Sequence, residues 1–134
     1  MSDPATRAAR FGWTSLALWA CAGVALEAAH AFKVSAYLDD ELARMLLRLA
    51  HAHGVGLSLV VIVFGAAAVP RLDEGLARHL GSALGAAAIL VPLGFALGAI
   101  AHPEGDPSLG ILLAPLGALA LVYALVRVAR EMWR

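Results

Sequence analysis

Residues 49–69 read LAHAHGVGLSLVVIVFGAAAV, a run of 21 residues without Asp, Glu, Lys or Arg. A transmembrane helix needs about 20 consecutive apolar residues to cross about 30 Å of hydrocarbon. Three further apolar runs near this length occur along the 134-residue chain, which is 61% hydrophobic and 15% charged. Soluble domains are only about 45 to 50% apolar. The sequence therefore predicts an all-α membrane protein, a four-helix transmembrane bundle.

We expect a single domain, residues 1–134, whose spans are separated by short polar turns. The expected spans are about residues 11–32, 41–69, 80–101 and 107–127. The first run follows two arginines and resembles a signal peptide in outline, but it is too long for the apolar region of one. We therefore expect it to be retained as a helix.

Polar residues and prolines mark the ends of the expected spans. Asp39 or Asp40 can accept hydrogen bonds from the free amides at the start of the second span. Pro70 is expected to stop that helix, because proline has no amide proton to donate. Asp106 and Pro107 form a typical pair of N-cap and first-turn residues, so we expect them to begin the fourth span.

The basic residues predict the orientation of the chain, because Lys and Arg next to spans are retained on the cytoplasmic side. Four spans place Arg7, Arg10, Arg71, Arg78, Arg127, Arg130 and Arg134 on one side, and Lys33, Arg44 and Arg48 on the other. We therefore expect both termini in the cytoplasm and an integral protein of the plasma membrane, the bacterial inner membrane.

Ionisable residues converge on one level of this topology. A charged side chain at mid-helix costs about 2.5 to 3.5 kcal/mol to insert, so such residues are functional candidates by default. The outer level receives Glu27, His30, His51, His53 and His102, which include four of the five histidines. We expect the metal ligands of an outward-facing site among these five residues. The ligands would be His30, either His51 or His53, and His102, with Glu27 as a further ligand or as a group that orients one.

Two spacings in this set resemble known metal-binding elements. Glu27 and His30 share a helix face, so one ion can contact both. They resemble the Glu-x-x-His element of ferritin-like carboxylate bundles, which implies a metal site. His51 and His53 lie about 200° apart around a helix, so only one can face the bundle. Residues 50–53, AHAH, resemble the His-x-His of haem-copper oxidases, whose two histidines serve different haem groups.

A cofactor site can be drawn beside these ligands. Gly94, Gly98 and His102 fall on one helical stripe, so a groove without side chains leads to His102. Either a neighbouring helix or a flat ligand such as a porphyrin can fill this groove. Arg48 can pair with Glu27 or with a carboxylate or propionate of a cofactor. Imidazole and carboxylate ligands suit Zn, Fe or Cu(II), and two opposed histidines suit haem b.

The leading hypothesis is a transition-metal or haem centre near the outer membrane face, for electron transfer, oxidoreductase chemistry or metal handling. The alternative is a proton- or ion-translocating protein in which Glu27, His30 and His51 form a titratable relay. Glycine pairs at small-xxx-small spacing, such as Gly81 with Gly85, favour close packing. They leave open a homo-oligomer or an accessory subunit of a larger membrane complex.

Other function classes find no support in the sequence. The net charge is zero and there is no basic face, so nucleic acid is not an expected partner. There is also no nucleophile with a base and no phosphate-binding loop, so no catalytic residue can be named. Whether the protein is an enzyme stays open.

Overall fold

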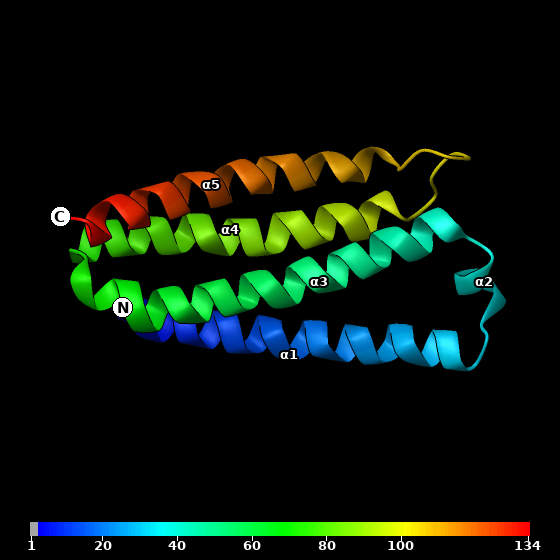
Figure 1. The fold of residues 1–134 in the computed structure, drawn as a ribbon, viewed down its shortest axis with the longest axis horizontal. Coiled ribbons are helices and arrows are strands. Elements are labelled where there is room, and N and C mark those ends of the chain that lie inside the picture. The colour runs from blue at the N-terminus through cyan, green and yellow to red at the C-terminus, as the bar shows by residue number, and fades with distance from the viewer. Residues whose placement is uncertain (1–2) are drawn as a thin grey trace.

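The computed structural model describes residues 3–134, and these residues form helices joined by short turns. The elements are α1 (Pro4–Ala31), α2 (Ser35–Leu38), α3 (Glu41–Val63), η1 (Phe64–Ala68), η2 (Val69–Arg71), α4 (Glu74–Gly98), η3 (Leu109–Leu112) and α5 (Leu113–Met132). Four helical segments are long and apolar enough to cross a membrane, which confirms the expected number. Both termini lie at the same end of the molecule (Figure 1).

Aspartates cap three of the long helices. The Asp3 carboxylate accepts a hydrogen bond from the Thr6 amide at 3.1 Å, and Asp73 accepts one from Leu76 at 2.9 Å. The cap expected from Asp40 is confirmed, because its carboxylate accepts the Ala43 amide proton at 2.8 Å. Each cap satisfies an amide that has no partner within the helix. Because of the caps at Asp3 and Asp73, α1 and α4 begin in polar sequence, well before their apolar runs.

The start of the last helix differs from the expectation. Pro107 lies outside the helix and the helical segment begins at Leu109, so the cap expected from Asp106 is wrong. Ser108 explains the difference, because its amide donates to the Gly98 carbonyl at 2.9 Å and its hydroxyl donates to Leu97 at 2.7 Å. These bonds hold the turn against the end of α4, and the chain re-enters a helix only after Ser108.

The end of the second span also differs from a regular α-helix. After Val63 the chain forms a π-helical turn, Phe64–Ala68, and then a 3₁₀ turn, Val69–Arg71, that contains Pro70. Pro70 cannot donate to the carbonyl four residues earlier, and its ring would clash there in an α-helix. 3₁₀ turns are frequent at the ends of α-helices, and π turns occur mostly as single turns that interrupt an α-helix.

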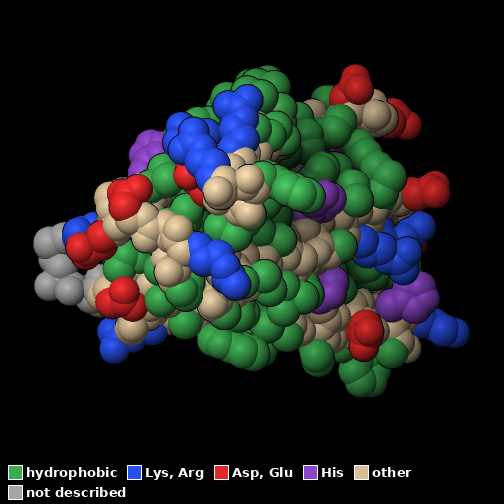
Figure 2. All heavy atoms as spheres, turned by 60° about the vertical axis from the view of Figure 1, so that its left-hand side comes forward, with side chains coloured by type: hydrophobic (Ala, Val, Ile, Leu, Met, Phe, Trp, Pro, Cys, Tyr) green, Lys and Arg blue, Asp and Glu red, His purple; other side chains and the backbone are tan. Residues whose placement is uncertain are grey.

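The long helices pack in a row in the order α1, α3, α4, α5 (Figure 1). α3 and α4 form the centre, where Leu57, Val61, Leu80 and Leu84 are buried against one another. α1 and α5 flank this pair, so most of their surface points outward. Figure 2 shows hydrophobic side chains over the middle of the molecule and charged side chains toward its two ends.

Glycines allow the flanking helices to approach very closely. A Cβ atom at Gly54 would stand 2.2 Å from the ring of Trp19 in α1, and one at Gly94 would stand 2.5 Å from the Ala114 nitrogen in α5. Gly98 is likewise covered by Ile111 of η3. Of the two occupants that the sequence allows for the Gly94 and Gly98 groove, the structure therefore shows the neighbouring helix.

Replacing Gly94 by alanine should destabilise the fold by about 1 to 3 kcal/mol, because the added methyl group overlaps the backbone of α5. The matched control is Gly56→Ala, whose Cβ would meet nothing within 4 Å. That variant should be neutral or more stable by up to about 1 kcal/mol, since alanine favours helix over glycine. The change in the free energy of unfolding of each variant can be measured in detergent by titration with dodecyl sulfate, followed by tryptophan fluorescence. Equal losses in the two variants would contradict the close α4–α5 contact.

Candidate functional site

A cavity of about 380 Å³ opens at the end of the molecule away from the termini. α1 and α3 diverge toward α2 at this end (Figure 1), and residues of all three helices line the cavity. Its lining residues are Gly23, Leu26, Glu27, His30, Ala31, Tyr37, Arg48 and His51. Four residues singled out in the sequence, Glu27, His30, Arg48 and His51, thus meet at one cavity although they come from two helices.

His51 has a fixed orientation in this cavity. Its Nδ1 lies 2.8 Å from the carbonyl oxygen of Trp19 in α1. A carbonyl only accepts, so Nδ1 carries the proton, and in the neutral ring Nε2 is left as an acceptor. The ring also packs directly on Gly23, where a Cβ atom would lie 2.4 Å from Cε1. Metal-ligating histidines are oriented in the same way, by a second ring nitrogen that donates to a carbonyl or carboxylate.

The other polar residues of the cavity are less constrained. Glu27 and His30 lie one turn apart near the end of α1, and both are exposed, as is Arg48. Glu27 and Arg48 line the same space without forming an ion pair among the described residues. Tyr37 is buried and reaches the cavity from α2. The cavity therefore combines one imidazole held by a hydrogen bond with exposed ionisable side chains that form no ion pair among the described residues.

His53 points away from this cavity, as its 200° separation from His51 predicts. Its Nδ1 donates to the Leu49 carbonyl of the same helix at 2.8 Å. The ring packs against Phe95 of α4, with centroids 4.9 Å apart. Within residues 3–134 no group of three or more His, Cys, Asp or Glu side chains lies close enough together to hold an ion. The five residues expected as ligands are therefore spread over three places.

His102 occupies the third place, in the turn after α4. Its Nε2 lies 2.8 Å from the Asp40 carboxylate, and its Nδ1 lies 2.8 Å from the Pro103 carbonyl. Both partners accept hydrogen bonds, so this geometry favours the ring with a proton on each nitrogen, the imidazolium. The hydrogen bond to Pro103 and then that to Asp40 raise the pKa of His102. The pKa of Asp40 is lowered, chiefly by its bond from the Ala43 amide and further by His102.

The sequence indicates Asp40 only as one of two candidate helix caps, beside Asp39, and nothing in it predicts the pairing of Asp40 with His102. No periodicity relates the two residues, because they lie 62 positions apart in different turns. Their ion pair fastens the α4–α5 turn to the first residues of α3. The pair lies at the same end of the molecule as the cavity, but His102 does not line the cavity.

Comparisons with protein-family models, with characterised proteins and with solved structures found no match for this chain. The side chains of the cavity supply two imidazoles, one carboxylate, one guanidinium and one phenol. The single cysteine, Cys21, does not line it. Such a set suits ions that prefer nitrogen and oxygen ligands and offers nothing to ions that need thiolate.

The ion pair between His102 and Asp40 should make stability depend on pH. Because the pKa of His102 is raised, its contribution is present in acid and is lost as the pH rises through that raised value. Because the pKa of Asp40 is lowered, its contribution is lost as the pH falls through that lowered value. The stability difference between wild type and His102→Gln should therefore be largest near about pH 5 and small in alkali.

Thermal unfolding in detergent between about pH 4 and pH 9 measures this difference. Asp40→Asn is the matched variant, because asparagine still caps α3 but carries no charge. It should follow the same pH dependence as His102→Gln. A stability difference that did not change with pH would show that the two residues do not form a charged pair.

Proposed function

We propose that this chain is a small integral membrane protein that binds one divalent transition-metal ion in the cavity between α1, α2 and α3. The expected ligands are His51, His30 and Glu27. The observation that carries the proposal is the orientation of His51, whose Nδ1 is engaged by the Trp19 carbonyl and whose ring lines the cavity. That arrangement leaves Nε2 with a lone pair for an ion.

The remaining ligands come from one turn of α1. Glu27 and His30 are exposed at the cavity, so rotation of their side chains can bring a carboxylate oxygen and a second imidazole toward His51. Imidazole and carboxylate together suit Zn²⁺, Cu²⁺ or Fe²⁺. Arg48 lines the same cavity and can hold the second oxygen of Glu27, which would orient the carboxylate.

Three features favour a bare ion over haem. The Gly94 and Gly98 groove is filled by α5 and η3, so it offers no slot for a porphyrin. His53 faces α4 and His102 is held by Asp40, so neither of these two histidines is placed to share a haem iron with His51. Metal handling at the membrane face is therefore the role that the cavity supports best.

One observation favours the translocation alternative. The buried Ser58 hydroxyl donates to the Gly54 carbonyl at 2.6 Å and lies 2.8 Å from the Ser15 hydroxyl, which continues the polar line of the α1–α3 interface inward from His51. Beyond this pair, Ile62 covers Gly12, where a Cβ atom would lie only 2.5 Å from its side chain. The series of polar side chains along the α1–α3 interface thus ends within the bundle. For this reason we favour metal binding over proton translocation as the function.

Metal binding can be measured on detergent-purified protein that has been stripped with a chelator. Zn²⁺ titrated against a competing indicator should bind at one ion per chain, and Co²⁺ should give the absorption of a nitrogen- and oxygen-ligated ion. His51→Ala should weaken Zn²⁺ binding by at least about a hundredfold, more than the loss of a group that only orients a ligand. His53→Ala is the matched control and should bind as the wild type does. Equal weakening by both variants would remove His51 as the ligand.

The proposed orientation places the cavity outside and the termini in the cytoplasm. It is supported by charge, because seven of the ten basic residues lie at the terminus end and six of the ten acidic residues at the cavity end. The acidic residues at the cavity end are Glu27, Asp39, Asp40, Glu41, Glu104 and Asp106. Basic residues retained inside would give this distribution.

Single cysteines in a Cys21→Ala background test the orientation. Glu104→Cys, in the turn between α4 and η3, should react with a membrane-impermeant maleimide in intact cells. Glu74→Cys, in the first turn of α4, should react only after the cells are permeabilised. The reverse pattern would place the cavity in the cytoplasm.

A further inference from the structure

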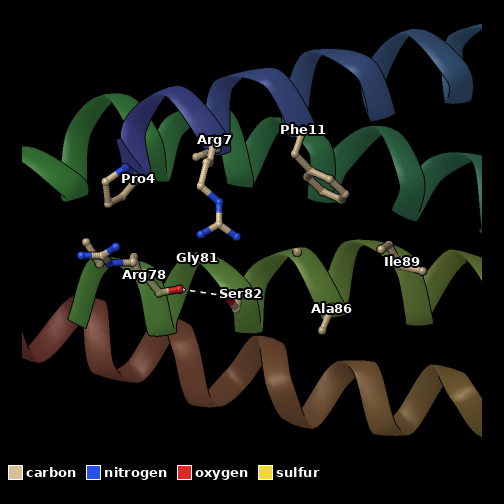
Figure 3. Close-up of a pocket in the computed structure, with 11 residues that line it drawn as sticks. Pro4, Arg7, Phe11, Arg78, Gly81, Ser82, Ala86 and Ile89 are labelled. Carbon is tan, nitrogen blue, oxygen red and sulfur yellow. Dashed lines mark hydrogen bonds between the residues drawn. The ribbon is translucent and has the colours of Figure 1, made fainter. Parts of the chain in front are cut away.

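A second cavity, of about 300 Å³, lies between α1 and α4 at the terminus end of the molecule (Figure 3). We call it the Arg7 groove. It is lined by Pro4, Arg7, Ala8 and Phe11 of α1 and by Ala77, Arg78, Gly81, Ser82, Gly85, Ala86 and Ile89 of α4. In Figure 3 the side chains of Arg7 and Phe11 point from α1 into the space above α4. The groove therefore has a basic end and an apolar end.

The groove is open because two glycines of α4 face it. A Cβ atom at Gly85 would meet nothing within 4 Å, and one at Gly81 would meet only the Phe64 ring, at 3.4 Å. At Gly94, which belongs to the same helix, a neighbouring helix fills the corresponding space. The described chain thus leaves a slot at Gly85 that none of its own side chains occupies.

The basic end of the groove suits a phosphate. Arg7 forms no ion pair among the described residues, whereas Arg78 is bound to Glu74 at 2.7 Å. A guanidinium presents several N–H donors in a fork that matches phosphate oxygens.

The length of the groove suits one acyl chain. From Arg78 to Ile89 the helix rises about 16 Å at about 1.5 Å per residue. This is close to half of the roughly 30 Å hydrocarbon thickness of a bilayer. With the arginines at headgroup level, Ile89 would lie near the middle of the membrane. A free phosphate would leave the apolar half of the groove empty. A transmembrane helix from another chain would need a longer groove.

We propose that the Arg7 groove binds one anionic phospholipid. The phosphate is held by Arg7 and by N–H groups of Arg78, and one acyl chain lies along Phe11, Gly85 and Ile89. Binding would join α1 to α4, two helices that otherwise make few direct contacts. The proposal requires that the helices span a membrane, but it requires neither the metal site nor a particular orientation.

Native mass spectrometry of the full chain in detergent tests the proposal. Phosphatidylglycerol, phosphatidylcholine and inorganic phosphate are each titrated, and the fraction of chains that retain an adduct is measured. The wild type should retain one phosphatidylglycerol more strongly than phosphatidylcholine. Arg7→Gln should weaken retention by about tenfold, as expected for loss of a charge-assisted hydrogen bond, whereas the control Arg10→Gln, outside the groove, should not.

The apolar half is tested by filling the slot. Gly85→Leu adds a side chain into space that is empty in this chain, so it should displace the lipid without unfolding the protein. Gly56→Leu is the matched control, because its Cβ also meets nothing within 4 Å but lies outside the groove. The proposal would be overturned if the wild type retained phosphatidylglycerol and phosphatidylcholine equally, or if inorganic phosphate displaced the lipid. It would also be overturned if Arg7→Gln weakened retention no more than Arg10→Gln, or Gly85→Leu no more than Gly56→Leu.

Discussion

Trp19 lies against Gly54, and one turn farther along the same interface the ring of His51 lies against Gly23. These two contacts bring the backbones of α1 and α3 close together. The same approach places the Trp19 carbonyl within 2.8 Å of His51. A larger residue at either glycine would separate the helices and leave His51 without its partner. The geometry of the cavity therefore depends on two positions that carry no chemistry of their own.

Much of this arrangement can be predicted from helical periodicity. The four long helices, the Asp40 cap and the opposite directions of His51 and His53 all follow from spacing within one segment. Contacts between segments could not be predicted in this way. The pairing of His102 with Asp40 depends on how two turns fold, and the late start of the last helix depends on bonds from Ser108 back to α4. Neither has a periodic signal.

The two glycine pairs of α4 show the same limit. Gly81 with Gly85 and Gly94 with Gly98 have identical spacing, and sequence alone treats them alike. The second pair is covered because the turn at Ser108 returns the chain directly onto it. The first pair is left open because α1 packs mainly on α3 and only approaches α4 near its start. The glycine spacing indicates where a neighbouring element can pack closely on α4. The arrangement of the helices determines whether such an element covers the glycines or leaves them open.

The row of helices also bears on how the chain is made. Along the row, α1, α3, α4 and α5 stand in the order in which they leave the ribosome (Figure 1). Each principal interface joins helices that are consecutive along the row, so every new helix emerges beside a partner that has already been synthesised. Contacts between segments that are distant in sequence slow folding, and apolar surface stays exposed until the distant segment has been synthesised. The four helices can therefore assemble stepwise, because each one packs against the helix that was synthesised just before it.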